Sequence, residues 1–305
     1  MQIQFRDIDA TADLAQLYND QIIDDSLGRV PFCFPVSAEE FVEGLRLGKD
    51  GDAPDTRLRS HKILVAEESG KPIAFADVAL ADLEEEGITG KTGIIRFLTY
   101  PPGSRSVGQA LLEAAEKYLQ DLGIVRIRAF LKTFSYRFYH LAFGMLSDRQ
   151  GHVHGLLGKN GYEQCQGEIF MAGPILDLPE PALPEEEVDI SVEEIPGRGS
   201  LPNLTVRALR NGRELGACYS HSAGEYVHCQ EAQMTGFTVG LGIEDLDQGR
   251  GWGLYLLRRS LWEMRKIGYD LATISTDWRN YRALLLYTNY GYHAIDTVYK
   301  WGKNC

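Results

Sequence analysis

The sequence contains two segments with the same order of features, and this internal repeat constrains the fold more than any other property of the chain. Each segment has two strand-like runs joined by a tight turn, then a third strand, an amphipathic helix and a fourth strand. Leu122-Gly123 in the first segment matches Ile267-Gly268 in the second, and Gly161-Tyr162 matches Gly291-Tyr292. Any two α/β domains can be aligned loosely, but landmarks in the same order favour two copies of one unit.

A segment rich in proline and glutamate separates the two copies. GPILDLPEPALPEEEVD, from Gly173 to Asp189, contains four prolines and several acidic residues, which predicts an extended, semi-stiff linker. We therefore predict an N-terminal domain at 1–175, a linker at 176–187 and a C-terminal domain at 188–305.

Composition and charge exclude several classes of protein. A net charge of −12 over 305 residues disfavours binding to nucleic acid. No apolar run approaches the roughly 18 residues of a membrane span, and MQIQFRDIDA has neither the basic start nor the apolar stretch of a signal peptide. We expect a cytoplasmic protein that does not associate with membranes, and the sequence leaves its oligomeric state open.

The cysteines and histidines form no metal or disulfide pattern. The five cysteines are scattered, without a C-x-x-C pair: Cys33, Cys165, Cys218, Cys229 and Cys305. This spacing disfavours a disulfide framework or a zinc site and is typical of a reducing cytoplasm. His152 and His154 have no third ligand nearby in the sequence, so we expect a plain loop there and no bound metal.

A glycine-rich turn in the second copy predicts a phosphate site. GIEDLDQGRGWGLYLL places Gly249, Gly251 and Gly253 where a strand ends and a helix must begin. The first N–H groups of a helix carry partial positive charge that suits phosphate, and glycine lets a phosphate approach the main chain. Arg250 adds charge and the Gln248 amide adds a donor. This turn therefore predicts a cradle for a diphosphate.

Three classes of phosphate loop compete for this turn. A Walker loop needs Gly-Lys-Ser/Thr, which is absent. A Rossmann site needs G-x-G-x-x-G with an acid at the end of the next strand, whereas the spacing here is G-x-G-x-G and Asp270 lies at the wrong end of its strand. The third class is the pyrophosphate loop of coenzyme A-dependent N-acetyltransferases, Q/R-x-x-G-x-G/A, which Gln248, Gly251 and Gly253 match.

The C-terminal copy resembles the GNAT acetyltransferase superfamily over essentially its whole length. The second motif of that family, N-x-x-A-x-x-x-Y-x-x-x-G-[FY], is present as Asn280, Ala283, Tyr287, Gly291 and Tyr292. The resemblance implies an α/β fold with a mixed sheet, built as two tandem acyl-CoA N-acyltransferase domains with splayed central strands. The layout is distantly similar to that of the mycothiol synthase family.

The resemblance also implies a cosubstrate, an acceptor and a set of site residues. Acetyl-CoA would transfer its acetyl group directly to a primary amine, carried by a small molecule or a peptide, with no metal. The strand ending at Ile243 and the strand ending at Thr276 would splay apart, and Tyr287 would protonate the departing thiolate. The residues implied for binding are Leu241 and Ile243 for the pantetheine arm, Gln248, Gly249, Arg250, Gly251, Trp252 and Gly253 for the pyrophosphate, and Asn280 for the arm or the adjacent strand.

Two alternatives stay open at this point. Tyr287 lies in the apolar run ALLLYTNYGY and can also be read as a core tyrosine. The chain can also be read as a non-catalytic acyl-CoA-binding or regulatory protein, because many family members carry a glutamate base on a strand that has none here between Thr235 and Ile243. Glu231, His228 and His221 are read either as bases acting through water or as ordinary residues, and Asp277 as an amine attractor or a loop cap.

The N-terminal copy keeps only part of the pattern. Arg105, Gly108 and Ala110 preserve the phosphate motif and mark a candidate second CoA site, but Leu157 and Gln150 stand at the tyrosine and asparagine positions. We therefore expect a degenerate domain, which also carries about 13 extra residues around SYRFYHLAFGMLSD and a strand with alternating arginines, IVRIRAF. Its segment 19–45 reads as a helix-loop-helix that the C-terminal copy lacks, so we expect it to supply a wall of the acceptor site.

Overall fold

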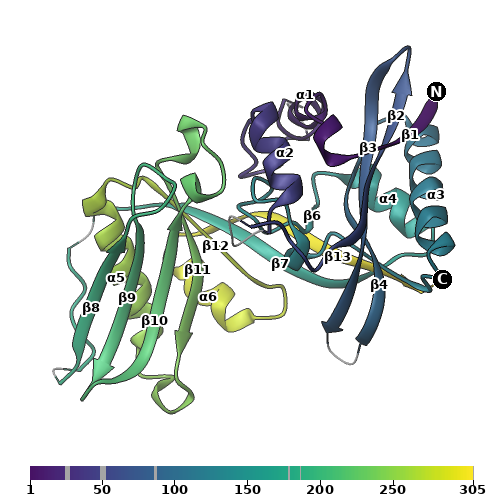
Figure 1. Cartoon of the computed structure of the whole chain (residues 1–305). Helices are drawn as coiled ribbons and strands as arrows, with labels where there is room; N and C mark the ends of the chain where they lie inside the picture. The colour runs from purple at the N-terminus through teal and green to yellow at the C-terminus, as the bar shows by residue number, and fades with distance from the viewer. Residues whose placement is uncertain (25–27, 49–52, 86–87, 178, 186, 305) are drawn as a thin grey trace. The chain divides into compact units, whose positions relative to one another are not determined.

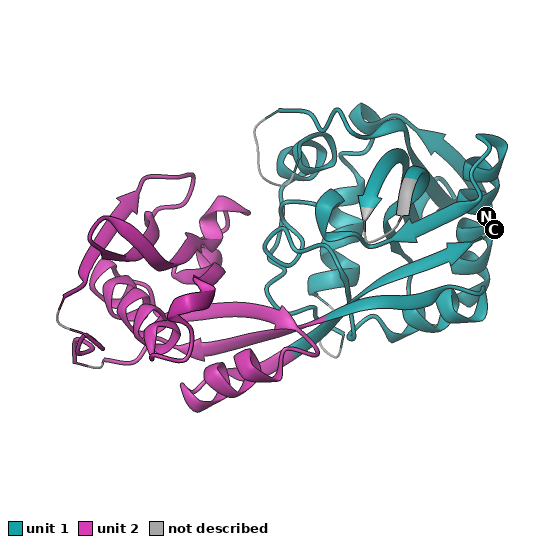
Figure 2. Cartoon of the chain, turned by 90° about the horizontal axis from the view of Figure 1, so that it is seen from below, with its two compact units in different colours: residues 1–167, 296–305 teal, residues 168–295 magenta. Residues whose placement is uncertain are grey.

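The computed structural model describes the chain except residues 25–27, 49–52, 86–87, 178, 186 and 305, so the predictions for Cys305 and for these parts of the linker and helix-loop-helix lie outside the described residues. The chain forms two compact units (Figure 2). Unit 1 contains residues 1–167 and 296–305, and unit 2 contains residues 168–295. This division differs from the predicted boundary in the linker because strands β7 (Glu163–Pro174) and β13 (His293–Asn304) each contribute one end to each unit.

Unit 1 has a mixed sheet whose order is β1-β2-β3-β4-β5-β13. Its first four strands are antiparallel, β4 runs parallel to β5, and the end of β13 pairs antiparallel to β5. The strands are β1 (Gln2–Arg6), β2 (Arg59–Glu68), β3 (Lys71–Glu85), β4 (Ile88–Thr99), β5 (Arg126–Ala129) and β6 (Leu146–Ser147), and the helices are α1 (Leu14–Tyr18), α2 (Ala38–Arg46), α3 (Arg105–Asp121) and α4 (Gly151–Lys159).

Unit 2 repeats this plan with fewer helices (Figure 1). Its sheet runs β7-β12-β11-β10-β9-β8, with β11 parallel to β12 and the remaining pairs antiparallel. Helix α5 packs along β9, β10 and β11 through Trp252, Leu256, Leu257 and Met264. The elements are β8 (Asp189–Ile195), β9 (Asn203–Arg210), β10 (Arg213–Ser222), β11 (Thr235–Ile243), α5 (Trp252–Ile267), β12 (Leu271–Asp277) and α6 (Tyr281–Asn289).

Local sequence explains where these elements turn and stop. The hairpin β9–β10 turns at Asn211 and Gly212, whose φ angles of 52° and 77° are those of a tight turn that suits the twist of two strands. Ser37 and Glu40 form a reciprocal capping box at the start of α2. The chain thus forms both hairpins, the central strands and the long helices where the sequence predicts them.

The predicted repeat is visible in matched hydrogen bonds. Gly123 and Gly268 both follow the long helix of their unit in the left-handed conformation, with φ of 78° and 114°. The Tyr162 N–H donates to the Leu157 carbonyl at 3.1 Å, and the Tyr292 N–H donates to the Tyr287 carbonyl at the same distance. Leu157 therefore occupies in unit 1 the position that Tyr287 occupies in unit 2.

One local prediction is wrong. His152 and His154 lie in the first turn of α4 and not in a loop, because Gln150 is already the N-cap residue of that helix. The Nε2 atoms of His152 and His154 lie 2.8 and 3.0 Å from the carbonyl oxygens of Tyr100 and Ser147. In the described part of the chain, no group of three histidine, cysteine, aspartate or glutamate side chains is placed to hold a metal ion.

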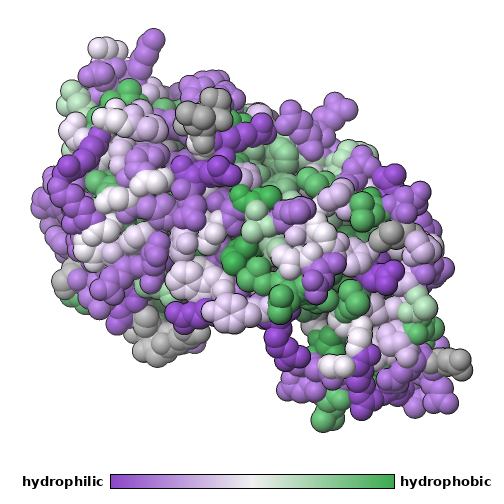
Figure 3. All heavy atoms as spheres, turned by 180° about the vertical axis from the view of Figure 1, so that it is seen from behind, coloured by the Kyte–Doolittle hydropathy of each residue, from purple (hydrophilic) through white to green (hydrophobic). Residues whose placement is uncertain are grey.

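The surface and the linker agree with an acidic, mostly polar chain. Hydrophilic residues cover most of the face seen in Figure 3, and apolar residues gather in a smaller area. Among the described helices, none has the length and apolar character needed to cross a membrane.

Linker residues Glu180 and Glu185 form ion pairs with Arg259 and Arg210, so the segment is attached to unit 2.

Candidate active site

Two parallel strands of unit 2 separate and open a wedge in the sheet. Strands β11 and β12 pair from Thr235 opposite Leu271 to Thr238 opposite Ile274, and the pairing stops there although β11 continues to Ile243. At this point the register of β10 against β11 shifts and leaves Val239 as the extra residue, which is a β-bulge. The bulge turns the rest of β11 away from β12.

The glycine-rich turn lies at the end of the diverging strand. Gly249 and Gly251 have φ of 78° and 88°, a conformation that side chains other than glycine adopt only with strain. Gly251 is the N-cap of α5, and no side chain caps the first N–H groups of this helix. A Cβ atom at Gly253 would contact only Ile243, at 3.8 Å. The first turn of α5 therefore presents open main-chain donors.

A pocket of about 410 Å³ joins this turn to helix α6. Nearly all of the sequence-predicted residues line it: Leu241, Ile243, Gln248, Gly249, Gly251, Trp252, Gly253, Asn280 and Tyr287. Sequence reasoning missed Asp247, Leu254, Arg282 and Leu286 among the lining residues. The i, i+4 spacing of Arg282 and Leu286 on the same helix as Ala283 and Tyr287 is the signal that indicates them.

Arg250 is the predicted residue that does not line the pocket. Its Nη1 atom lies 3.8 Å from a carboxylate oxygen of Glu185 in the linker segment, and the side chain is half exposed. Gln248 also serves the turn itself, because its Nε2 donates to the Ile243 carbonyl at 3.1 Å and to Asp245 at 3.0 Å. These two side chains brace the turn, so the main-chain N–H groups are the donors that it leaves open.

The buried carboxylate of Asp247 is compensated within the protein. Arg213 donates to Asp247 at 2.7 Å and Arg210 at 3.3 Å. The hydrogen bond from Arg213 holds the pKa of Asp247 below its usual range. The two arginines therefore offset the negative charge of Asp247, which would otherwise oppose an anion in the same pocket.

Tyr287 is buried with its side chain on the pocket. It is 6% exposed, and its ring centroid lies 6.1 Å from that of Tyr292. Burial raises the pKa of Tyr287 to about 12, with a smaller contribution from the thiol of Cys218. Its hydroxyl forms no hydrogen bond with any residue in the described part of the chain. The phenol is thus a protonated donor available to a ligand.

Asn280 has a clear local role. It is the N-cap of α6, where its Oδ1 accepts a hydrogen bond from the Ala283 N–H at 3.2 Å. This bond uses the side-chain oxygen, and the amide nitrogen of this pocket-lining residue forms no hydrogen bond in the described part of the chain.

Comparison with solved structures identifies the fold. A tandem GNAT protein from the clavulanic acid biosynthesis pathway has a TM-score of 0.70 at 12% identity, over 99% of this chain and 98% of that one. The chain has the tandem GNAT fold. A GCN5-related N-acetyltransferase from Sphaerobacter thermophilus gives a TM-score of 0.62 at 19% identity, over 99% and 95% of the two chains.

A third similar structure belongs to a much longer protein. It is a GCN5-related glucosamine N-acetyltransferase region in a fungal multi-domain beta-N-acetylglucosaminidase, with a TM-score of 0.67 and 15% identity. The alignment covers 99% of this chain and 38% of that protein. No family model matches the sequence, and no curated protein matches it. The likeness is therefore one of fold.

The candidate bases do not line the pocket between the glycine-rich turn and α6. His221 Nδ1 is 2.9 Å from the Tyr226 hydroxyl, and His228 is 3.4 Å from Arg198. Asp277 accepts the Arg279 N–H at 2.8 Å and so caps the turn into α6. Glu231 lies in a short helical turn, Gln230–Ala232. In the described part of the chain, none of these four residues lines the pocket. Strand β11 itself contains no carboxylate.

The GNAT repeat in unit 1 has side chains where unit 2 has a pocket. Tyr100 stands five residues before Arg105, as Ile243 stands five before Gln248. A Cβ atom on Gly108 would lie 2.5 Å from the Tyr100 ring, so this glycine makes room for a side chain. The Tyr100 hydroxyl donates to the His152 carbonyl at 2.7 Å, bridging the strand end to α4. Arg105 is exposed and Ala110 half-buried on the same helix.

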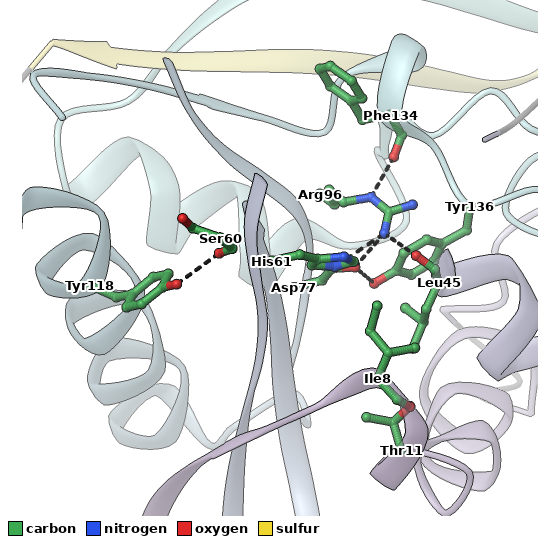
Figure 4. A network of polar contacts seen from close by, with 10 residues as sticks. All are labelled: Ile8, Thr11, Leu45, Ser60, His61, Asp77, Arg96, Tyr118, Phe134 and Tyr136. Atoms are coloured by element: carbon green, nitrogen blue, oxygen red, sulfur yellow. Dashed lines mark hydrogen bonds and ion pairs between the residues drawn. The ribbon is translucent and has the colours of Figure 1, made fainter. Parts of the chain in front are cut away.

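The other face of unit 1 is filled by its own extra residues. Rings from the inserted segment pack on Phe97 of β4, with centroids 5.3 Å away for Tyr136 and 5.1 Å for Tyr139. Beneath them, Asp77 accepts hydrogen bonds from Arg96 at 2.9 Å and Tyr136 at 2.8 Å and lies 2.7 Å from His61 (Figure 4). Burial raises the pKa of Asp77, but the charge of Arg96 outweighs it and the pKa is lowered. This face is a packed core with an ionised centre.

Proposed function

We propose that unit 2 is an acetyl-CoA-dependent N-acetyltransferase that moves an acetyl group directly to a primary amine. The observation that carries the proposal is one pocket lined by both the glycine turn and the phenol of Tyr287. A diphosphate binder alone has no need for a protonated, unpartnered phenol in the same pocket.

Binding would use the main chain first. The N–H groups between Gly249 and Gly253 would hold the pyrophosphate, and Leu241 and Ile243 would pair with the pantetheine arm as an added strand. Arg282, exposed at the start of α6 and lining the same pocket, would add a positive charge beside the phosphates.

The transfer step needs one proton donor. The neutral amine attacks the acetyl carbonyl, a C–N bond forms, and the C–S bond breaks to release the thiolate. A thiol has an ordinary pKa of about 8.5, well below the value of about 12 for Tyr287. The phenol therefore stabilises the departing thiolate as a hydrogen-bond donor, and the proton lost by the amine balances the proton the thiol gains.

A second reading is a protein that binds acyl-CoA without transferring the acyl group. The position of His221, His228, Glu231 and Asp277 away from the pocket favours it, because the amine then lacks an adjacent base. The four described cysteines are free thiols, which supports a reducing cytoplasm as the location of the protein under both readings.

The test measures thiol release from acetyl-CoA with a panel of amines. For the native chain we expect turnover with at least one amine. The variant Tyr287→Phe should lose about 10²- to 10⁴-fold in kcat while CoA affinity by calorimetry stays unchanged. Tyr290→Phe is the control, because Tyr290 lies three residues along at the C-cap of α6 and does not line the pocket. CoA binding without release for every amine would establish the second reading, and no CoA binding would refute both.

A further inference from the structure

Unit 1 contains a second cavity that the acyl-donor site does not use. Its volume is about 280 Å³, and it lies where β5, β13 and β7 are adjacent. Arg128 from β5, Gly302 and Asn304 from β13, and Glu163 and Cys165 from β7 contribute to its lining. Arg128 is one of the two alternating arginines of the IVRIRAF strand.

A glycine creates the hollow. Gly302 is the register partner of Arg128, and a Cβ atom on Gly302 would lie 2.7 Å from Arg128 Nη1 and 2.8 Å from Cys165 Sγ. Real Cβ atoms essentially never approach so closely. The guanidinium and the thiol therefore lean over the bare backbone of residue 302.

The guanidinium of Arg128 has no counterion among the residues that the structure describes. The residue is 8% exposed, and the hydrogen bond it forms runs from Nη1 to the Ile127 carbonyl at 3.1 Å. Among the described residues, no carboxylate lies within ion-pair distance of it. Arg96, buried to a similar degree, has Asp77 at 2.9 Å and two carbonyls as partners.

A buried, uncompensated guanidinium is costly unless a partner arrives from solution. Lys303 does not change this balance, because its Nζ is bound to Glu116 at 2.8 Å. Glu163 lines the same cavity without pairing with Arg128. The cavity thus offers a fork of N–H donors that matches a planar or tetrahedral oxyanion.

We infer that this cavity, the Arg128 pocket, binds a small anionic molecule through a carboxylate or phosphate group. The guanidinium contacts the oxyanion, and the amide of Asn304 is a second donor on its wall. A cavity of about 280 Å³ has room for a few further atoms of the ligand beyond its anionic group. All of its residues belong to unit 1, so the inference stands independently of acyl transfer in unit 2.

The test is calorimetric titration of the full chain with inorganic phosphate and, separately, with malonate, at constant ionic strength. We expect one saturable site for at least one of the two, and the better ligand identifies the preferred anionic group. Arg128→Gln should weaken binding about 10- to 100-fold, the value of a lost charge-assisted hydrogen bond. Arg126→Gln is the matched control, because it removes the same charge two residues away on the same strand, outside the cavity lining.

A second variant protects the test against misfolding. Gly302→Ala places a methyl group against the guanidinium and should abolish the rise in melting temperature that the anion produces in the native chain. Equal affinity in the native chain and Arg128→Gln would overturn the inference. So would the absence of saturable binding of both anions to the native chain.

Discussion

Gly251 and Gly253 lie two residues apart, yet the same substitution should change stability in opposite directions. Gly251 has φ of 88° and no neighbour within 4 Å of a Cβ atom, so Gly251→Ala adds backbone strain without a clash. The left-handed conformation costs a residue with a Cβ about 1–2 kcal/mol. Gly253 is inside α5 with open space beside it, so Gly253→Ala should gain up to about 1 kcal/mol of helix propensity.

Urea unfolding followed by tryptophan fluorescence measures this contrast. Trp252, Trp262 and Trp278 all lie in unit 2, so the signal reports mainly on the unit that carries the change. We expect the midpoint of Gly251→Ala below that of the native chain and the midpoint of Gly253→Ala at or above it, with unchanged slopes. A Gly251→Ala variant as stable as the native chain would refute the argument that backbone strain selects glycine there. If Gly253→Ala were the less stable of the two, the assigned start of α5 would be wrong.

Two further predictions concern the buried charge of unit 1 and the phenol of unit 2. Asp77→Ala leaves Arg96 buried without its carboxylate and should cost about 3–5 kcal/mol in the free energy of unfolding by urea. Asp82 lies on the same strand as Asp77 but is exposed and pairs with Arg59, so Asp82→Ala should cost no more than about 1 kcal/mol. Equal losses of stability in the two variants would contradict the role of Asp77. Because burial raises the pKa of Tyr287 to about 12, the donor stays protonated at high pH, and kcat for a chosen amine should not decline near pH 10, the ordinary pKa of tyrosine. A decline centred near pH 10 would contradict this, because the donor would then titrate as an exposed tyrosine does.

The local geometry of the candidate site follows from the sequence, because each part depends on few neighbouring residues. The glycine spacing from Gln248 to Gly253 sets the turn, and the helical offset from Asn280 to Tyr287 places both on one pocket. The matched Gly-Tyr pairs likewise predict which residue replaces Tyr287 in the first copy.

Contacts between distant segments were not predictable in this way. Arg250 is read from the motif as a phosphate ligand, but it pairs with Glu185, a partner that no local pattern indicates. Tyr100 has the pattern of a strand end, and only the fold places its hydroxyl on the carbonyl of His152. The division into units also depends on which strand edge meets the last residues of the chain.

The pairing of β13 with β5 affects how unit 1 folds while the chain is being synthesised. Residues 126–129 form an outer edge of the first sheet until residues 301–304 arrive to cover them. On a ribosome, which delivers the N-terminus first, this edge stays uncovered until residues 301–304 have been synthesised. An uncovered edge is a template for pairing with other chains. Truncated chains that end before β13 should therefore aggregate, even though they contain the described helices α1 to α4 of unit 1.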